Sequence, residues 1–382
     1  MRPHPLTFLS PLRYGLFAFP LFLVACPGGK DTGSGSEGVG EEGGGSEGGG
    51  IEGGGSEGGG SEGGGSEGGG SEGGGSEGGS EGGGTGGDDT GGSTEGRGWT
   101  TVPLAALTEL SSGECPDLSA SGTSSFLSSD EDRTVTAIIP EGGTEDAPLV
   151  VFFHGLTTPD ATPNPTEYMA EALDLQSVAD EFGVVILLPE APLRDLFGLE
   201  FYLWDVENLN GTDLVLYDDL RTCAADELNI DLNRVHAFGF SGGALFTTVV
   251  AGYRADTLAS MVEHSGGSDI TIPFYSYPVS EYQTPAWTLP ALLGSGGDTD
   301  VWPSTSLALI DFEAATDNLS DELVADSSFV VRCHHDSGHT ITTEGYLLTI
   351  DWLLAHTYGE PSVYETDGLG ADSSWCEALG GS

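Results

Sequence analysis

Basic residues are scarce in this sequence, and their scarcity excludes one class of partner. Lysine and arginine together number 10, against 61 aspartates and glutamates, for a formal net charge of -51. Residues 99–382 contain no lysine at all. Binding to nucleic acid needs clustered lysines and arginines against the phosphates, and charge repulsion also disfavours anionic polymers and anionic lipid headgroups. We therefore expect no nucleic-acid partner.

Long hydrophobic runs are absent as well. The apolar stretch Tyr14–Ala25 is interrupted by Pro20 and is too short to cross a bilayer as a helix, but it is typical of the apolar region of a secretory signal peptide. It ends in LVAC, which resembles a bacterial lipobox and implies lipidation of Cys26. The alternative is an ordinary signal peptide followed by a chance cysteine. Residues 1–26 thus predict an exported protein, either extracellular or anchored by acyl chains on Cys26 at the bacterial cell surface, with the outer membrane as the expected membrane.

Residues 27–98 consist mostly of GGGSE repeats. Such a sequence buries too little apolar surface to offset the conformational entropy lost on folding. We expect a disordered linker with a root-mean-square span of about 45–50 Å, extended further by repulsion between its glutamates. Calcium binding by the repeated glutamates is the alternative interpretation.

Residues 99–382 have the length and composition of one folded domain. Short apolar runs alternate with segments of helical periodicity, which indicates an α/β fold with a mostly parallel sheet flanked by helices. The expected strands are 135–139, 149–153, 184–188, 235–240, 261–262, 291–293 and 329–331, and the expected helices are 167–182, 212–228, 242–253 and 343–356.

A G-x-S-x-G motif follows the strand expected at 235–240. Gly239, Ser241 and Gly243 form it, between an apolar strand and a helix of small residues. In a nucleophile elbow, the glycines permit a sharp turn from strand to helix that exposes the serine hydroxyl at a helix N-terminus. This context favours a nucleophilic serine over a glycine-rich turn with an incidental serine.

An elbow serine requires an acid and then a histidine later in the chain. His339 follows an expected strand and is the predicted base, because a histidine must take the proton of the serine. Asp298 and Asp300 follow an earlier strand. We expect Asp298 to hold the histidine in its reactive tautomer, with Asp300 as the second choice. The N–H groups of Leu156 and Gly242 are the expected oxyanion donors.

The order of five sequence blocks resembles a known family. FFHG, WD, YDDL, NRVHAFGFSGGA and CHHDSGHT are similar to blocks of the secreted poly(3-hydroxybutyrate) depolymerases and feruloyl esterases, a group of α/β-hydrolases. The resemblance covers roughly residues 133–356 and implies the α/β-hydrolase fold, ester hydrolysis, and Ser241, Asp298 and His339 as catalytic residues. Two segments depart from the group: the acid-bearing loop reads LGSGGD where the group begins with His-Gly, and the residues after His154-Gly155 are LTTP.

Four cysteines lie in the domain, an even number that indicates two disulfides in an exported protein. Three pairings are possible, and the hypothesis that we favour is a bridge between Cys115 and Cys376, which lie near the two ends of the domain. The candidates are Cys115, Cys223, Cys333 and Cys376.

Two further groups of residues have alternative interpretations. His334, His335 and Asp336 lie close to His339, but the intervening Asp-Ser-Gly favours a loop over the helix that an i, i+4 metal pair needs, so we expect no metal and no cofactor. Aromatic residues in 268–289 either line a substrate groove or pack a cap onto the sheet. Tyr202 and Trp204 could stack on a planar acyl group.

The hypothesis that these residues favour is a cell-surface serine esterase. It would cleave esters of extracellular polymers or their oligomers, of the hydroxybutyrate type or the feruloyl and acetyl polysaccharide type, through an acyl-enzyme. An acidic domain favours a neutral ester substrate. The alternatives are a non-catalytic surface binding protein on a hydrolase scaffold and a serine peptidase.

Overall fold

The computed structural model describes residues 102–382, apart from 197, 273–277, 305–307, 371–372 and 381–382. Cys26 and the linker 27–98 therefore lie outside the described residues, and the predictions made for them stay predictions. Within the described part of the chain, no helix is both long enough and apolar enough to cross a membrane.

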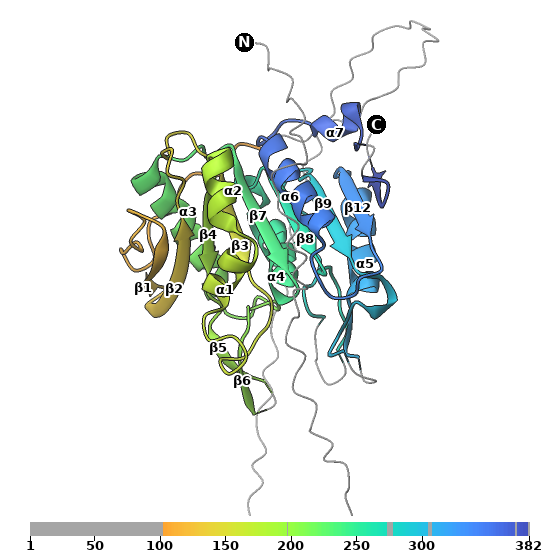
Figure 1. Ribbon diagram of the computed structural model, residues 1–382, viewed down its shortest axis with the longest axis horizontal. Coiled ribbons are helices and arrows are strands. Elements are labelled where there is room, and N and C mark those ends of the chain that lie inside the picture. The colour runs from red at the N-terminus through yellow and green to blue at the C-terminus, as the bar shows by residue number, and fades with distance from the viewer. Residues whose placement is uncertain (1–101, 197, 273–277, 305–307, 371–372, 381–382) are drawn as a thin grey trace, which may run out of the picture. The chain divides into compact units, whose positions relative to one another are not determined.

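In the described residues, a nine-stranded sheet runs through the domain in the order β1-β2-β4-β3-β7-β8-β9-β12-β13 (Figure 1). The strands from β4 to β12 pair in parallel, whereas β1, β2 and β13 join antiparallel at the two edges. The strands are β1 (Gly122–Ser128), β2 (Glu131–Ile138), β3 (Leu149–Phe153), β4 (Val185–Pro189), β7 (Val235–Phe240), β8 (Ser260–His264), β9 (Ala291–Ser295), β12 (Val330–His334) and β13 (Cys376–Leu379). Two hairpins stand apart from this sheet, namely β5 (Leu193–Leu196) with β6 (Leu199–Tyr202) and β10 (Val301–Trp302) with β11 (Ile310–Asp311).

Helices cover both faces of the sheet. One face packs against α1, α2 and α6, which lie in front of the strands in Figure 1, and the other packs against α3, α4 and α5. The helices are α1 (Pro165–Ala172), α2 (Leu175–Phe182), α3 (Thr212–Leu228), α4 (Gly242–Arg254), α5 (Phe312–Ala325), α6 (Thr343–Ala355) and the short α7 (Val363–Asp367). This arrangement confirms the predicted α/β fold.

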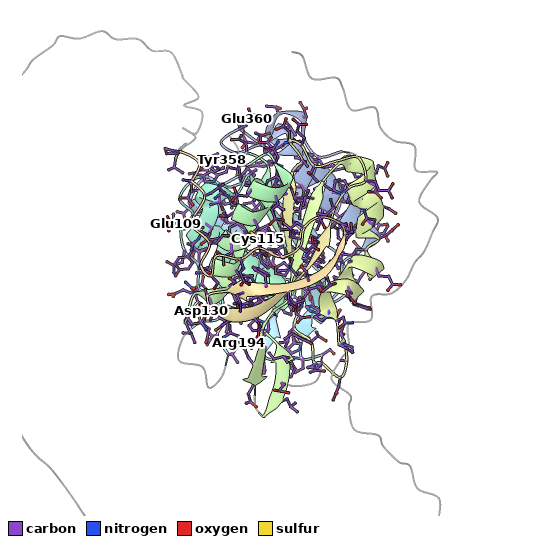
Figure 2. The ribbon with its side chains drawn as sticks, turned by 90° about the vertical axis from the view of Figure 1, so that its left-hand side faces the viewer. Glu109, Cys115, Asp130, Arg194, Tyr358 and Glu360 are labelled. Carbon is purple, nitrogen blue, oxygen red and sulfur yellow. A yellow bond between two sulfur atoms is a disulfide. The ribbon has the colours of Figure 1, made fainter. Side chains whose placement is uncertain are left out.

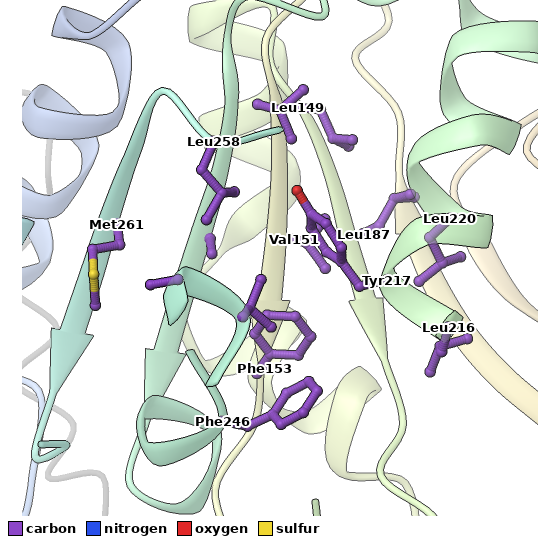
Figure 3. Packing of buried hydrophobic residues seen from close by; sticks show 14 of the residues in the cluster. Leu149, Val151, Phe153, Leu187, Leu216, Tyr217, Leu220, Phe246, Leu258 and Met261 are labelled. Carbon is purple, nitrogen blue, oxygen red and sulfur yellow. The ribbon is translucent and has the colours of Figure 1, made fainter. Parts of the chain in front are cut away.

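The central strands are apolar on both sides because both faces are covered. On β3, Leu149, Val151 and Phe153 point into the cluster formed with α3 and α4, as Figure 3 shows. Val150 and Phe152 alternate with them and point to α2 and α6. Full burial of a side chain of this size contributes about 1.5–3 kcal/mol, so each strand is held from both sides.

The helix predicted over 167–182 is wrong as a single element. Asp174 has φ 48°, a left-handed conformation that separates α1 from α2. Gly183, with φ 66°, ends α2 where the sequence predicted the helix to stop. The interruption leaves two short helices, α1 and α2, and each of them packs against both β2 and β4.

The two disulfides join Cys115 to Cys223 and Cys333 to Cys376. The predicted Cys115–Cys376 bridge is therefore wrong. Cys376 lies on β13 directly opposite Cys333 of β12, at one edge of the sheet. Cys115 lies on the other side of the domain, where β1 and β2 cross in front of the viewer in Figure 2, and reaches α3. Two disulfides fit an exported protein.

The loops that these disulfides close differ in length, and we expect their effects on stability to differ in the same order. The chain-entropy relation gives about 5 kcal/mol for the bridge of sequence separation 108 and about 4 kcal/mol for the bridge of separation 43. In urea unfolding followed by circular dichroism, the free energy of unfolding of Cys115→Ala/Cys223→Ala should be lower than that of Cys333→Ala/Cys376→Ala. The reverse ranking would contradict an entropic origin.

Candidate active site

The turn between β7 and α4 presents Ser241 in a strained conformation. Ser241 has φ 56° and ψ -126°, which side chains rarely adopt, and its N–H donates to the carbonyl of His264 on the adjacent strand at 3.0 Å. A Cβ on Gly239 would lie 2.4 Å from the carbonyl oxygen of Gly243, and one on Gly243 would lie 2.0 Å from that of Phe153. Both motif glycines are therefore required by close backbone approach, as a nucleophile elbow demands.

His339 lies between Ser241 and an acid. Its Nε2 is 2.8 Å from the Ser241 hydroxyl, and its Nδ1 is 2.6 Å from Oδ1 of Asp300. The imidazole stacks on the ring of Phe312 at 4.5 Å and lies 5.1 Å from the ring of Phe240. The loop between β12 and α6 thus holds the imidazole between two aromatic side chains, with one nitrogen toward the serine and the other toward the acid.

The acid beside the histidine is Asp300, so the prediction of Asp298 is wrong and the second choice holds the position. Asp298 lies on a single turn, η2 (Gly297–Thr299), and its side chain is exposed to solvent. Asp300 follows that turn and is completely buried. Gly297 has φ 74°, and this turn directs the later carboxylate, rather than the earlier one, inward.

Two further groups orient the Asp300 carboxylate. Its Oδ2 accepts a hydrogen bond from the Ser265 hydroxyl at 2.8 Å and another from the Gly296 N–H at 2.8 Å. Sequence reasoning missed Ser265, which the parallel register of β8 and β9 brings beside the acid-bearing loop. The available signal was its position directly after a strand, at the same edge of the sheet as the other site residues.

The expected oxyanion donors lie together beside the serine. A Cβ on Gly242 would be only 3.1 Å from the Leu156 nitrogen, so the two residues are in contact. Gly242 is the first residue of α4, and its N–H therefore has no acceptor within the helix. Both residues line a cavity that contains Ser241. The arrangement suits a pair of N–H donors toward a developing negative charge.

His154 shapes the loop that carries Leu156. It is buried, its Nδ1 donates to the Gly155 carbonyl at 2.8 Å, and its Nε2 accepts from the Ala191 N–H at 3.0 Å. Burial lowers the pKa of His154 to about 4, so the ring is neutral and can make both bonds. The Trp204 indole N–H donates to the His154 carbonyl at 2.9 Å.

The cavity beside Ser241 has a volume of about 210 Å³ and a mixed lining. Most of the lining residues are apolar, namely Leu156, Leu203, Trp204, Val206, Leu209, Leu245, Ile272, Val279, Trp302, Ile310 and Phe312. Three acids and one arginine also line the cavity, namely Asp195, Asp205, Glu207 and Arg194. Figure 2 labels Arg194, which lies on the β5–β6 hairpin and donates to the Leu203 carbonyl and to Asp213.

The aromatic residues expected near the site lie mostly in packing positions. Trp287 is buried and donates to the Ala255 carbonyl, and the Tyr282 hydroxyl donates to Asp326, so both support the packing interpretation of 268–289. Tyr202 donates to the Pro163 carbonyl. Trp204 lines the cavity, but its ring stacks on Phe246 rather than standing free. Phe274, Tyr275 and Tyr277 lie outside the described residues.

Of the two histidines before His339, His334 pairs with acids, whereas His335 Nδ1 accepts from the Ser337 N–H at 3.2 Å. His334 pairs with Glu313 at 2.8 Å and with Asp336 at 3.3 Å, and these contacts raise its pKa, with the Glu313 bond as the main cause. Among the residues that the structure describes, no group of three or more histidine, cysteine, aspartate or glutamate side chains could hold a metal ion.

The geometry predicts different consequences for the two candidate acids. Asp300→Asn should slow covalent labelling of Ser241 by a fluorophosphonate probe about 10³–10⁴-fold, because the amide disfavours the reactive histidine tautomer. Asp298→Asn is the matched control, and its labelling rate should equal that of the unmodified protein. A loss of labelling in the Asp298 variant alone would contradict the geometry.

Comparisons with known proteins agree with this architecture. No protein-family model matches the chain. The bifunctional acetylxylan esterase/xylanase XynS20E of Neocallimastix patriciarum is 27% identical over 136 residues, which is 35% of this chain and only 18% of that protein. The crystal structure of sOPH has a TM-score of 0.55 at 15% identity and covers 72% of this chain and 98% of its own. That of pOPH has a TM-score of 0.55 at 17% identity, covering 70% and 97%. By sheet order, by its elbow and by these likenesses, the chain has the α/β-hydrolase fold.

Proposed function

We propose that this protein is a serine esterase that hydrolyses neutral carboxylic esters through an acyl-enzyme. The observation that carries the proposal is the hydrogen-bonded series Ser241–His339–Asp300, placed at a strained strand-to-helix turn. A nucleophile, a base and an orienting acid in this order form the arrangement that activates a serine hydroxyl. The neighbouring N–H groups of Leu156 and Gly242 complete it.

The proposed reaction follows from these positions. Ser241 attacks the ester carbonyl carbon while His339 Nε2 takes the hydroxyl proton, and the N–H groups of Leu156 and Gly242 donate to the resulting oxyanion. His339 then gives the proton to the departing alcohol oxygen, which leaves the acyl group bound to Ser241. Water then attacks the acyl carbonyl carbon while His339 Nε2 takes one of its protons, and His339 returns that proton to the Ser241 oxygen as the carboxylic acid leaves. Asp300 keeps the imidazole oriented and stabilises its transient positive charge.

The cavity favours short or aromatic acyl groups without charge. Its volume of about 210 Å³ is below the range of about 300–1,000 Å³ typical of pockets for drug-sized ligands. Burial, and then the charge of Asp205, raises the pKa of Glu207 in the cavity wall. Arg194 is engaged with Asp213 and Leu203, so an anionic acyl group would meet carboxylates without a free cation among the described lining residues.

The substrate class that we propose is an ester of an extracellular polymer or its oligomers. The relative's name includes an acetylxylan esterase, which supports the acetyl polysaccharide type, although the match spans less than a fifth of that protein. The feruloyl type is part of the proposal through the sequence resemblance. Hydroxybutyrate oligomers belong to the same proposal through the sequence resemblance. The small cavity supports cleavage of soluble fragments rather than of long-chain lipids.

Location at the cell surface is part of the proposal. A signal peptide at 1–26 would place a lipid on Cys26, and residues 27–98 would tether the catalytic domain, 99–382, at a distance from the membrane. The two disulfides support export, because such bonds persist in oxidising compartments.

An ester panel tests the activity and its selectivity together. We expect p-nitrophenyl acetate, p-nitrophenyl butyrate and methyl ferulate to be cleaved faster than p-nitrophenyl palmitate. The mono-p-nitrophenyl ester of succinate, which matches butyrate in length but carries a carboxylate, should have a kcat/KM about tenfold lower, or about 1.4 kcal/mol. Glu207→Gln should narrow that difference.

Controls for the panel separate chemistry from selectivity. Ser241→Ala should lose nearly all activity on each ester, and mass spectrometry of the unmodified protein should detect an acyl adduct on Ser241 during turnover. Exposed Glu322, remote from the cavity residues, supplies a charge-matched control, Glu322→Gln, that should leave selectivity unchanged. Preference for palmitate, or activity that survives Ser241→Ala, would refute the proposal.

The anchor is tested without reference to catalysis. If Cys26 is lipidated, the full-length protein partitions into the detergent phase of a Triton X-114 extract, because two or more acyl chains give stable membrane binding. Cys26→Ser should move the protein to the aqueous phase or leave it unprocessed. Equal partitioning of the two proteins would contradict lipidation.

A further inference from the structure

A buried carboxyl group lies beneath the elbow and takes no part in the reaction described above. Glu263, on β8, is completely buried among the elements that carry the triad. Its Oε1 lies 2.7 Å from the Thr248 hydroxyl of α4, and its Oε2 accepts from the Gly267 N–H at 2.9 Å. Thr248 also lies 3.1 Å from the Gly267 carbonyl oxygen. These contacts therefore join strand, helix and loop, and the Ser280 hydroxyl also lies 3.0 Å from the Gly267 carbonyl oxygen.

The number of protons in this set determines the state of the carboxyl group. The Thr248 hydroxyl has one proton and faces two acceptors, a carboxyl oxygen of Glu263 and the carbonyl oxygen of Gly267. If Glu263 were ionised, the single Thr248 proton could serve only one of these two contacts, and in the other contact two oxygen atoms would face each other without a proton between them. If Glu263 is protonated, its O–H donates to Thr248, and Thr248 donates to Gly267. The neutral acid satisfies both contacts.

Among the residues that the structure describes, the groups in contact with Glu263 carry no charge. Its neighbours are Ala244 and Thr248 of α4, Gly239 across on β7, Leu293 across on β9, and the backbone of Gly266 and Gly267. None of these neighbours has an ionisable side chain. Burial is the main cause that raises its pKa to about 8, against the opposing effect of its hydrogen bonds.

The network holds the loop on which the triad acid depends. The loop after β8 begins with Ser265, which donates to Asp300, and continues to Gly267, which Glu263 holds. A Cβ on Gly266 would lie 2.2 Å from the Glu263 carboxyl, so the loop packs directly on that group. On the helix side, Thr248 belongs to α4, which begins directly after Ser241. Glu263 thus connects α4, the helix that follows Ser241, to the loop whose Ser265 binds Asp300.

We propose that Glu263 is a positioning residue that acts as a neutral carboxylic acid, tying α4 to the 265–267 loop, and that loss of its proton in alkaline solution releases Asp300 from its orientation toward His339. The kinetic consequence rests on the proposed esterase function, whereas the protonation state does not.

The sign of the stability effect follows from proton binding. Glu263 holds its proton in the folded protein at pH values where an unfolded glutamate has lost it, so the folded state binds more protons. Stability therefore falls as pH rises from about 4.5, and the loss is complete above about 8. A glutamine at this position cannot ionise and should not show that dependence.

The informative substitution is Glu263→Gln. Its amide NH₂ can donate to Thr248 while its oxygen accepts from Gly267, which reproduces the neutral acid. We expect its kcat on p-nitrophenyl butyrate near pH 7 to lie within about twofold of the unmodified protein. Above about pH 8, the rate of the unmodified protein should fall by up to about tenfold per pH unit as Glu263 ionises, and the variant should lack this fall. Glu263→Ala should be impaired at every pH, and Glu281→Gln, at an exposed nearby position, should match the unmodified protein.

Two measurements do not require ester hydrolysis. Difference infrared spectra of the unmodified protein against Glu263→Gln near neutral pH should show the C=O stretch of one protonated carboxylic acid. Tm of the unmodified protein should fall relative to that of the variant as pH rises from about 5 to about 9. If the infrared band and the pH dependence of Tm are observed but no ester is cleaved, the proposed function is refuted and the neutral state of Glu263 is not. Absence of the infrared band, or an alkaline fall in rate shared by both proteins, would overturn the inference.

Discussion

The close backbone contact between the β7–α4 turn and β3 is the constraint on which the rest of the site depends. Gly243 lies so near the Phe153 carbonyl that a single methyl group would not fit, and this contact fixes where α4 begins and where Ser241 points. Parallel pairing then brings the carboxyl ends of β3, β7, β8, β9 and β12 to one edge of the sheet. The loops that leave these ends supply, in the same order, an oxyanion donor from Leu156, the nucleophile Ser241, the hydroxyl of Ser265 that binds the acid, the acid Asp300 and the base His339. The site is therefore a consequence of sheet topology as much as of any single motif.

The parts of the fold that could be predicted are those buried on two faces. The strand β3 was predicted with both of its ends, because the continuous apolar run LVVFF has one simple interpretation in an α/β protein. The edge strand β1 and the β5–β6 hairpin were missed, because polar residues interrupt their sequences and leave no continuous apolar run. The break at Asp174 could not be predicted either, because the apolar spacing continues through it. Periodicity records which face is buried, not where the backbone changes direction.

The site shows the same division between local and long-range information. Ser241 and His339 could be located because a motif and a chain order specify them, and these signals are local. The choice between Asp298 and Asp300 depended on the turn at Gly297, whose φ of 74° determines which carboxylate faces inward. Ser265 and Phe312, which contact Asp300 and His339, lie far from them in sequence and belong to no motif. Residues that position a catalytic group are held by tertiary contacts, and a single sequence contains little information on such contacts.

This strongly acidic chain can hold such a site because three buried ionisable side chains near the site are uncharged. Burial lowers the pKa of His154 to about 4 and that of His264 to about 3, while it raises the pKa of Glu263 to about 8, so each is uncharged near neutrality. In a medium of low polarity, an additional charge at any of these positions would act strongly on the imidazole of His339. With those positions neutral, the charge that develops on His339 during proton transfer meets chiefly Asp300. Most of the acidic side chains in the described residues are exposed or partly exposed, where water and salt screen their charge.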